Sequence, residues 1–392
     1  MKKKTLNTTI ALTLATATLP VLAEVTLYDY TEANSAYEDA YLSGSANFSK
    51  SRNDKQAAYD LKLDADYKKV FSTPKRDTTL EFTGNGLVTR AGTEGAESND
   101  TYTAGTAATI DTYFEEGSKG AFWYGKASVG GDSEQDDLAT ALTVGLGYGR
   151  VTNVTPMAKA IRLINALAEQ GSISSKPSKA VHNEIAKIIS VESEYQSKHG
   201  AKPKYYQKHW IGDIEKVLRG SGVLSGNLSA TGILQARDTL IDERISTRKI
   251  GWKVRAGVSY IGTNFEGIKN KPGLELGAEY HHPISNSTQF SNEAVLNTIF
   301  DSDASNAYTL KNKMSLTHEI DDRIDWENSW TLDYKKLDGG TDQTINTLTS
   351  TFLYELSNSL DYSVSAQVSN TDGTANDGTD RSLNMGIRYR LK

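Results

Sequence analysis

One short segment sets the pattern that recurs through most of the chain. In Tyr59–Tyr67 every odd position is apolar and every even position is charged, and an aromatic residue stands at each end. A β-strand has a side-chain period of two, so this segment has one apolar face and one polar face. A helix would spread the charges around its whole circumference. Repeated alternation of this kind is typical of transmembrane β-barrels, with lipid outside and water inside.

The alternation predicts an all-β transmembrane antiparallel up-and-down barrel of about 14 strands. An even number of strands is typical of bacterial single-chain barrels. The expected strands lie near residues 40–50, 59–67, 78–89, 102–114, 121–129, 138–148, 252–260, 274–280, 289–300, 308–317, 324–334, 344–354, 360–368 and 383–391.

The period changes between Thr155 and Thr247, where apolar residues recur at spacings of three and four. A first helix is expected to begin at Thr155 and to stop at Gly171. Three more are expected over about 178–198, 205–219 and 230–247. In the third, Tyr206, Trp210 and Ile214 share the apolar stripe. These stripes predict a small α-helical bundle inserted between strands 6 and 7.

The lengths of the connections also alternate. Those after odd-numbered strands are mostly longer and acidic or glycine-rich, such as 338–342 and 370–380. Those after even-numbered strands are mostly tight, such as 283–287, 319–323 and 357–359. Outer-membrane barrels have short periplasmic turns and longer outside loops, so both termini and the helical insertion are expected in the periplasm. This placement depends on the parity of the strand count.

The first 23 residues have the features of a secretory signal peptide. Lys2, Lys3 and Lys4 precede an apolar stretch, and cleavage is expected near Ala23. The predicted location is the outer membrane of a Gram-negative bacterium. The expected organisation is a signal peptide (1–23), an N-terminal periplasmic lead-in (24–39), a first part of the barrel (40–152), the periplasmic helical insertion (153–248) and a second part of the barrel (249–392).

Composition removes several classes of function. The net charge is −6, and loss of the three lysines of the signal peptide makes it −9, which argues against a nucleic-acid partner. The chain has no cysteine, so disulfides and cysteine-based metal sites or nucleophiles are excluded. His182, His199 and His209 do not share a metal-ligand spacing. We expect no metal and no cofactor.

The segments 40–152 and 249–392 resemble a Gram-negative outer-membrane β-barrel of the porin-like kind. The resemblance lies in the strand pattern and not in a diagnostic motif. One departure is the end of the chain, where Ile387, Tyr389 and Leu391 keep the alternation but the final residue is Lys392 and not an aromatic residue. The resemblance implies contact with outer-membrane lipid and passive transport of small solutes or ions.

Charged residues alternate with apolar ones in the expected strands and are the candidates for lining the lumen. Their mixed signs either set a field in a pore or pair across strands in a narrow, hydrated interior. The candidates are Asp60, Lys62, Asp64, Asp66, Glu81, Lys126, Lys253, Arg255, Glu275, Glu279, Lys311, Lys313, Asp325, Glu327, Arg388 and Arg390.

The helical insertion offers a second candidate site. Tyr205, Tyr206, Lys208, His209 and Trp210 concentrate aromatic and basic groups in an acidic chain. They suggest a docking surface for a periplasmic protein or for the cell wall, with a self-packed bundle and a solvated basic face as the alternative. The alternative function is accordingly a non-conducting envelope scaffold that docks an export or cell-envelope partner.

A barrel lipid hydrolase is a third and weaker hypothesis. His281, His282 and His318 fall near the ends of expected strands 8 and 10. These strands are not adjacent, and no serine–histidine–acid arrangement follows from the spacing. We therefore expect that the chain is not an enzyme.

Overall fold

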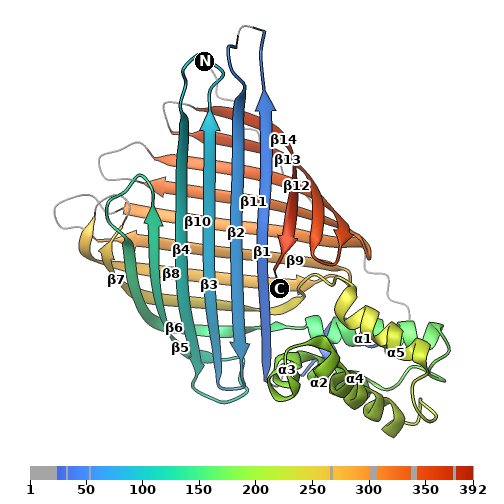
Figure 1. Ribbon diagram of the computed structural model, residues 1–392. Helices are drawn as coiled ribbons and strands as arrows, with labels where there is room; N and C mark the ends of the chain where they lie inside the picture. Colours follow the sequence, from blue (N-terminus) through green and yellow to red (C-terminus); the bar gives the residue numbers. More distant parts are fainter. Residues whose placement is uncertain are drawn as a thin grey trace, which may run out of the picture.

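The computed structural model describes residues 24–31, 34–52, 54–264, 268–300, 307–336, 342–373 and 377–391, so the predicted signal peptide lies outside the described residues. Fourteen antiparallel strands form a closed barrel in which each strand pairs with its neighbours in the sequence and β1 closes against β14 (Figure 1). The helices lie between β6 and β7. The predicted fold class is confirmed.

The strands are longer than the sequence pattern indicated. Those before the helices are β1 (Ser35–Ser49), β2 (Ala58–Ser72), β3 (Arg76–Arg90), β4 (Ser98–Tyr113), β5 (Ala121–Asp132) and β6 (Ala139–Asn153). Those after the helices are β7 (Lys249–Thr263), β8 (Lys269–Pro283), β9 (Thr288–Ile299), β10 (Ala307–Asp321), β11 (Ile324–Lys336), β12 (Gln343–Ser357), β13 (Leu360–Asp372) and β14 (Gly378–Arg390).

The first strand begins at Ser35 and not near residue 40. Residues 35–39 pair with residues 68–72 of β2, so their backbone groups are satisfied in the sheet. Of the described residues, 24–31 and Asn34 precede the barrel, and the last part of the expected lead-in (35–39) belongs to β1.

The connections alternate in length as expected. At the end that carries the helices they are mostly short, covering 73–75, 284–287, 322–323 and 358–359, with 114–120 as the longer exception. At the other end they include 50–57, 91–97 and 133–138. The predicted loops at 338–342 and 370–380 lie partly outside the described residues.

The outside of the barrel is apolar. In β6, Leu142, Val144 and Leu146 are 60–61% exposed, whereas Thr143 between them is only 5% exposed. Since successive side chains of a strand point to opposite faces, the exposed apolar set lies outside and the polar set inside. An exposed apolar band over a whole barrel suits hydrocarbon as its surroundings.

One inner wall is packed with aromatic rings. Tyr113, Phe122 and Tyr124 form a fully buried cluster on β4 and β5. Glycines in β6 make room for it, because a Cβ atom on Gly147 would lie 2.7 Å from the carbonyl oxygen of Val254 and closer still to the ring of Phe122. The lumen is therefore narrowed on this side.

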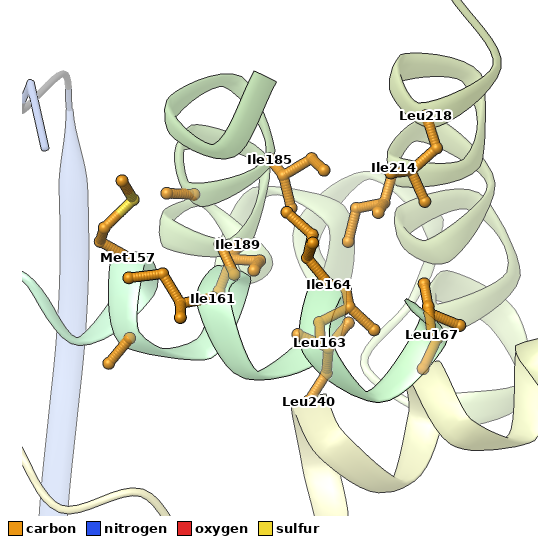
Figure 2. Packing of buried hydrophobic residues seen from close by; sticks show 14 of the residues in the cluster. Met157, Ile161, Leu163, Ile164, Leu167, Ile185, Ile189, Ile214, Leu218 and Leu240 are labelled. Carbon is orange, nitrogen blue, oxygen red and sulfur yellow. The ribbon is translucent and has the colours of Figure 1, made fainter. Parts of the chain in front are cut away.

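The helices form one domain at the end of the barrel where β1 begins (Figure 1). Figure 2 shows Ile164, Ile185 and Ile214, from three different helices, pointing into a common core. None of the helices in the described ranges is long and apolar enough to cross a membrane. The elements are α1 (Thr155–Glu169), α2 (Lys179–Ser190), α3 (Glu192–His199), α4 (Pro203–Gly220), α5 (Ala230–Arg237) and the π-helical turn η2 (Asp238–Asp242).

Two helix boundaries differ from the prediction. The second predicted helix is divided at Val191, whose ψ of 28° is not helical. The fourth ends at Asp242, because Glu243 adopts an extended conformation with ψ of 129°. Residues Glu243–Arg248, which we call the strap, run on without helical structure to the start of β7.

The N-terminal segment belongs to the same unit. The short 3₁₀ helix η1 (Leu27–Asp29) places Leu27 and Tyr30 in the core of the helical domain. The Nζ atom of Lys179 in α2 lies 3.0 Å from the carboxylate of Asp29. Residues before β1 therefore help to hold the domain against the barrel.

Two residues predicted to dock a partner are core residues. Trp210 is 0% exposed and Tyr206 is 4% exposed. The indole Nε1 of Trp210 donates a 2.9 Å hydrogen bond to the carbonyl oxygen of Ile188, and the Tyr206 hydroxyl donates one of 2.6 Å to Glu192. Positions four apart share a helix face, so both residues follow the apolar stripe of α4 inward.

We predict that Trp210→Ala destabilises the helical domain by about 3–5 kcal/mol, because it leaves a large cavity in the core. Trypsin should then cut the lysine-rich helices much faster in the folded, detergent-solubilised protein, while the heat-dependent gel shift of the barrel is retained. The neighbouring exposed change Tyr205→Ala should cost within about 0.5 kcal/mol. Equal cleavage rates in the two variants would contradict this assignment.

Candidate functional site: the charged lumen and its helical cover

Every charged residue predicted to line the lumen lies in a strand. Glu81 is an example, since it is flanked by Leu80 and Phe82, which are 38% and 41% exposed on the outside. Alternation then directs Glu81 inward. The predicted lumen residues fall on the polar face of their strands in the same way, and they differ in what they contact.

On the wall formed by β4–β8 the charges pair with one another. The Nζ atom of Lys253 lies 2.9 Å from Asp111, and that of Lys126 lies 2.7 Å from Glu275. Each pair joins strands that are three apart in the barrel, so these side chains reach across a corner of the lumen. Arg255 lies 3.4 Å from Glu275 and extends the network. Here the charges neutralise one another.

Further predicted residues also form ion pairs on the inner face. Arg388 holds Glu327 through two hydrogen bonds of 3.0 and 3.2 Å. The other pairs are Lys253–Glu279, Arg255–Glu279, Lys62–Asp64 and Lys68–Glu81.

A second group has no ion-pair partner among the described residues. It consists of Asp60, Asp66, Lys311, Lys313 and Arg390. Asp66, Lys311 and Lys313 line one cavity of ≈ 970 Å³ inside the barrel. Charges free of ion pairs that border an open space act on whatever enters it, so this part of the lumen retains a field.

Three cavities adjoin along the barrel. The ≈ 970 Å³ cavity shares Lys68 and Glu81 with a second cavity of ≈ 260 Å³. That cavity shares Tyr37 and Asn153 with a third, of ≈ 500 Å³, between the barrel and the helical domain. A row of spaces therefore extends from the charged lumen to the helices.

The helical domain and the N-terminal segment span this mouth of the barrel. The Thr247 hydroxyl lies 3.4 Å from the carboxylate of Asp39 on β1. The Tyr28 hydroxyl lies 2.5 Å from Nδ1 of His282 on β8. β1 and β8 lie on opposite sides of the ring of strands. The domain therefore covers the mouth from one side to the other.

A buried carboxylate on β10 anchors the helical domain, which we call the cover, to the barrel. Glu319 is 6% exposed and lies 2.7 Å from the guanidinium of Arg248, which is fully buried. Glu319 also pairs with Arg162 of α1 and accepts a 2.7 Å hydrogen bond from the backbone amide of Ser246. One carboxylate thus joins the barrel to both α1 and the strap.

The two guanidinium groups at Glu319 respond differently to burial. Burial lowers the pKa of Arg248 below its usual value in spite of the nearby carboxylate. Burial opposes the charge of Arg162 as well, but Glu319 and Glu243 together raise its pKa. Arginine keeps its charge near neutral pH, so Glu319 faces two cations.

A second anchor lies beside the first. Arg244 of the strap pairs with Asp361 at the start of β13 and lies 3.7 Å from Asp325 at the start of β11. Both carboxylates are buried. Asp325 was predicted to line the lumen, and it lies at the covered mouth. Removing one partner of a buried ion pair leaves an uncompensated charge and is strongly destabilising.

Sequence reasoning missed most of these anchors. Glu319 was placed in a turn, although it keeps the parity of Lys311 and Lys313 along β10. The sequence pattern places Arg244 in the fourth helix and Arg248 just beyond it, because Ile245 continues the apolar spacing of that helix.

The three histidines of the hydrolase hypothesis do not come together. His281 is buried and its Nδ1 lies 2.9 Å from the Ser291 hydroxyl, but its Nε2 is 3.8 Å from Glu279, beyond hydrogen-bond distance. His282 contacts the N-terminal segment, and His318 contacts a β9 hydroxyl. No acid completes a serine–histidine relay among these described residues.

Comparison with known proteins gives one family match. Residues 242–356 match a family described as "Protein of unknown function, DUF481". The match covers the end of η2, the strap and β7–β11, together with most of β12, which is less than half of the chain. No curated protein matches.

Several solved structures are similar over most of their length. The anion-selective porin from Comamonas acidovorans is 8% identical, with 91% of this chain and 100% of that chain covered and a TM-score of 0.34. OmpT of Vibrio cholerae, with loop L8 deleted, is 9% identical (92% and 100% covered, TM-score 0.33). Omp33 of Acinetobacter baumannii is 9% identical (91% and 99%, TM-score 0.32). Scores this low carry no argument about function, which rests on the geometry above.

We predict that Glu319→Gln loosens the cover, because it leaves Arg162 and Arg248 without their shared carboxylate. The expected loss of docking free energy is about 3–5 kcal/mol. Hydrogen exchange of the strap amides in the intact protein measures it. Glu215→Gln, which removes an exposed pair with Arg219 within α4, should cost about 0.5 kcal/mol or less. Unchanged strap exchange in Glu319→Gln would refute the anchoring role.

Proposed function

We propose that this chain is an integral outer-membrane β-barrel that acts as a passive channel for small hydrophilic solutes or ions, with the helical domain as its gate. The observation that carries the proposal is a closed barrel with an apolar outside and a charged inside that borders adjoining cavities. A closed antiparallel ring satisfies backbone groups between strands, which makes the architecture stable in hydrocarbon.

The orientation follows from the connections. The short turns and the helical domain share one end of the barrel, and short turns face the periplasm in outer-membrane barrels. The proposal therefore places the helical domain in the periplasm. Export through cleavage near Ala23 belongs to the same proposal.

Gating follows from the position of the helical domain. The domain contacts opposite sides of the mouth, and its anchors at Glu319 and Asp361 lie on the rim. The ≈ 500 Å³ cavity beneath it adjoins the lumen. Movement of the domain away from the rim would join that cavity to the periplasm and open the path.

A covalent lock on the cover tests both parts of the proposal. The Asn358 side chain in the β12–β13 turn donates a 2.8 Å hydrogen bond to Asp242 of η2, and the chain has no native cysteine. In planar bilayers, Asp242→Cys/Asn358→Cys should conduct when free. The current should fall to a low level after reaction with a short bis-methanethiosulfonate cross-linker, which forms a disulfide with each cysteine and releases methanesulfinate, and reduction of these disulfides should restore the current.

The matched control places the same cross-link within α4. Glu215→Cys/Arg219→Cys carries two cysteines one helical turn apart and should conduct equally before and after cross-linking. Absence of current from every folded variant would refute the channel. Equal current from the free and locked covers would refute the gate alone.

An envelope scaffold is the second proposal, and a specific observation favours it. Tyr205, Lys208 and His209 remain exposed on the outer side of α4. His209 stacks on His199 at a centroid distance of 3.9 Å. This basic and aromatic surface suits an anionic periplasmic protein or the cell wall. Such a scaffold would bind its partner through the helical domain, and its barrel would not conduct.

A further inference from the structure

The seam that closes the barrel is short. β1 and β14 pair over four positions, Tyr41–Gly44 against Ile387–Arg390. Each of the other neighbouring pairs extends over ten or more. In Figure 1 the end of β14, near the C-terminus, lies beside β1. Residues 45–49 and 378–386, all of them described, have no strand partner across the seam. The wall is therefore open away from the helical domain.

The exposure of the two edges agrees with an opening. Residues 378–383 of β14 are all exposed, although a strand inside a closed wall alternates between its two faces. On β1, Phe48 is 70% exposed. Both faces of each edge are accessible here.

The opening lies at membrane depth. The ring of Phe48 lies 6.4 Å from that of Tyr59, and the Arg90 guanidinium lies 4.6 Å from the Tyr59 ring. Aromatic and arginine side chains at this level are typical of the interfacial belt of a barrel. The gap runs from Gly44 to this belt, which places it in the outer half of the bilayer. Unpaired backbone groups at this depth need a polar partner.

The side chains that line the gap are apolar on the lipid side and polar on the lumen side. Alternation along the two strands places apolar side chains toward lipid and uncharged hydrogen-bonding side chains toward the lumen. Between Gly44 and Ser49 the lipid side carries Ala46, Phe48, Leu383 and Met385, and the lumen side carries Ser45, Asn47, Ser382 and Asn384. The charged residues Asp380 and Arg381 belong to the unpaired part of β14 farther from Gly44. This combination suits a single-chain amphiphile with an uncharged, hydroxylated head.

The same seam can close without a change of register. Extending the four existing pairs sets Ala46 opposite Met385 and Phe48 opposite Leu383, so apolar residues meet on the lipid side. Glycines occupy the branch point, where a Cβ atom on Gly386 would lie 2.7 Å from the carbonyl oxygen of Gly44. Because the two strand ends match in register and in the faces of their side chains, the seam can exist in an open state and in a closed state.

We infer that the β1–β14 seam is a lateral opening between the lumen and the outer leaflet. It admits a single-chain amphiphile with an uncharged head, and it closes by forming up to five further residue pairs. The unpaired backbone groups and the neutral polar side chains bind the head, and the apolar edge binds the chain. This inference rests on the proposed placement of the barrel in the outer membrane, and it is independent of whether the pore conducts.

Cysteine cross-linking in lipid vesicles tests the two states. Residues opposite one another in a closed seam have Cβ atoms about 4.5–5.5 Å apart, close to disulfide geometry. Ala46→Cys/Met385→Cys should oxidise completely but several-fold more slowly than Ala46→Cys/Leu61→Cys, whose residues are already paired between β1 and β2. Equal rates mean a closed seam, and no cross-link means one that never closes. Either result overturns the inference.

Quenching tests entry of the amphiphile. A small fluorophore on Asn47→Cys faces the lumen at the gap, and one on Thr347→Cys faces the lumen from β12, where Thr347 pairs with Ser369. In vesicles containing a monoacylglycerol with a nitroxide on its chain, quenching at position 47 should exceed that at 347 at least two-fold. Equal quenching at the two positions overturns lateral entry.

Discussion

A backbone without water must satisfy its hydrogen bonds within the protein, and the rest of this structure depends on that requirement. The apolar outer face of the strands, such as Leu142, Val144 and Leu146, is stable in hydrocarbon. In hydrocarbon, strands have to pair on both edges. Closure into a ring follows, and closure creates the lumen. The inward charges are then enclosed and have to find partners, water or a ligand.

The inner charges differ in what satisfies them. Where aromatic rings narrow the lumen, Lys253 and Lys126 are fixed by carboxylates from strands three positions away. Lys311 and Lys313 border the ≈ 970 Å³ cavity without an ion pair among the described residues, although Lys126 borders the same cavity. A charge withdrawn from water needs a partner that offsets its desolvation, whereas a charge beside an open cavity keeps access to water.

The sequence could predict most of the fold but less of the site. A period of two depends on neighbouring residues only, so strand number and inner face follow from it. The anchors at Glu319 join segments far apart in the chain, which no local period reports. Trp210 is a different case, because the local pattern contained the correct answer. Its place in the apolar stripe of α4 predicts a buried residue, whereas its aromatic and basic neighbours suggested a docking surface. The seam joins the two ends of the barrel sequence, β1 and β14, and alternation within a strand does not report how far they pair.

Polar groups that leave water are satisfied differently at the covered mouth and at the β1–β14 seam. At the covered mouth, charged groups leave water and are satisfied by arginines of the helical domain. At the seam, backbone groups leave the sheet at Gly44 and no described residue replaces their partners. Buried ion pairs hold one arrangement firmly, since breaking them leaves charge uncompensated. The backbone groups of an unpaired strand edge can hydrogen-bond either to the neighbouring strand or to a ligand. The cover is therefore expected to leave the rim in a single step that breaks its ion pairs, whereas the seam is expected to open and close repeatedly.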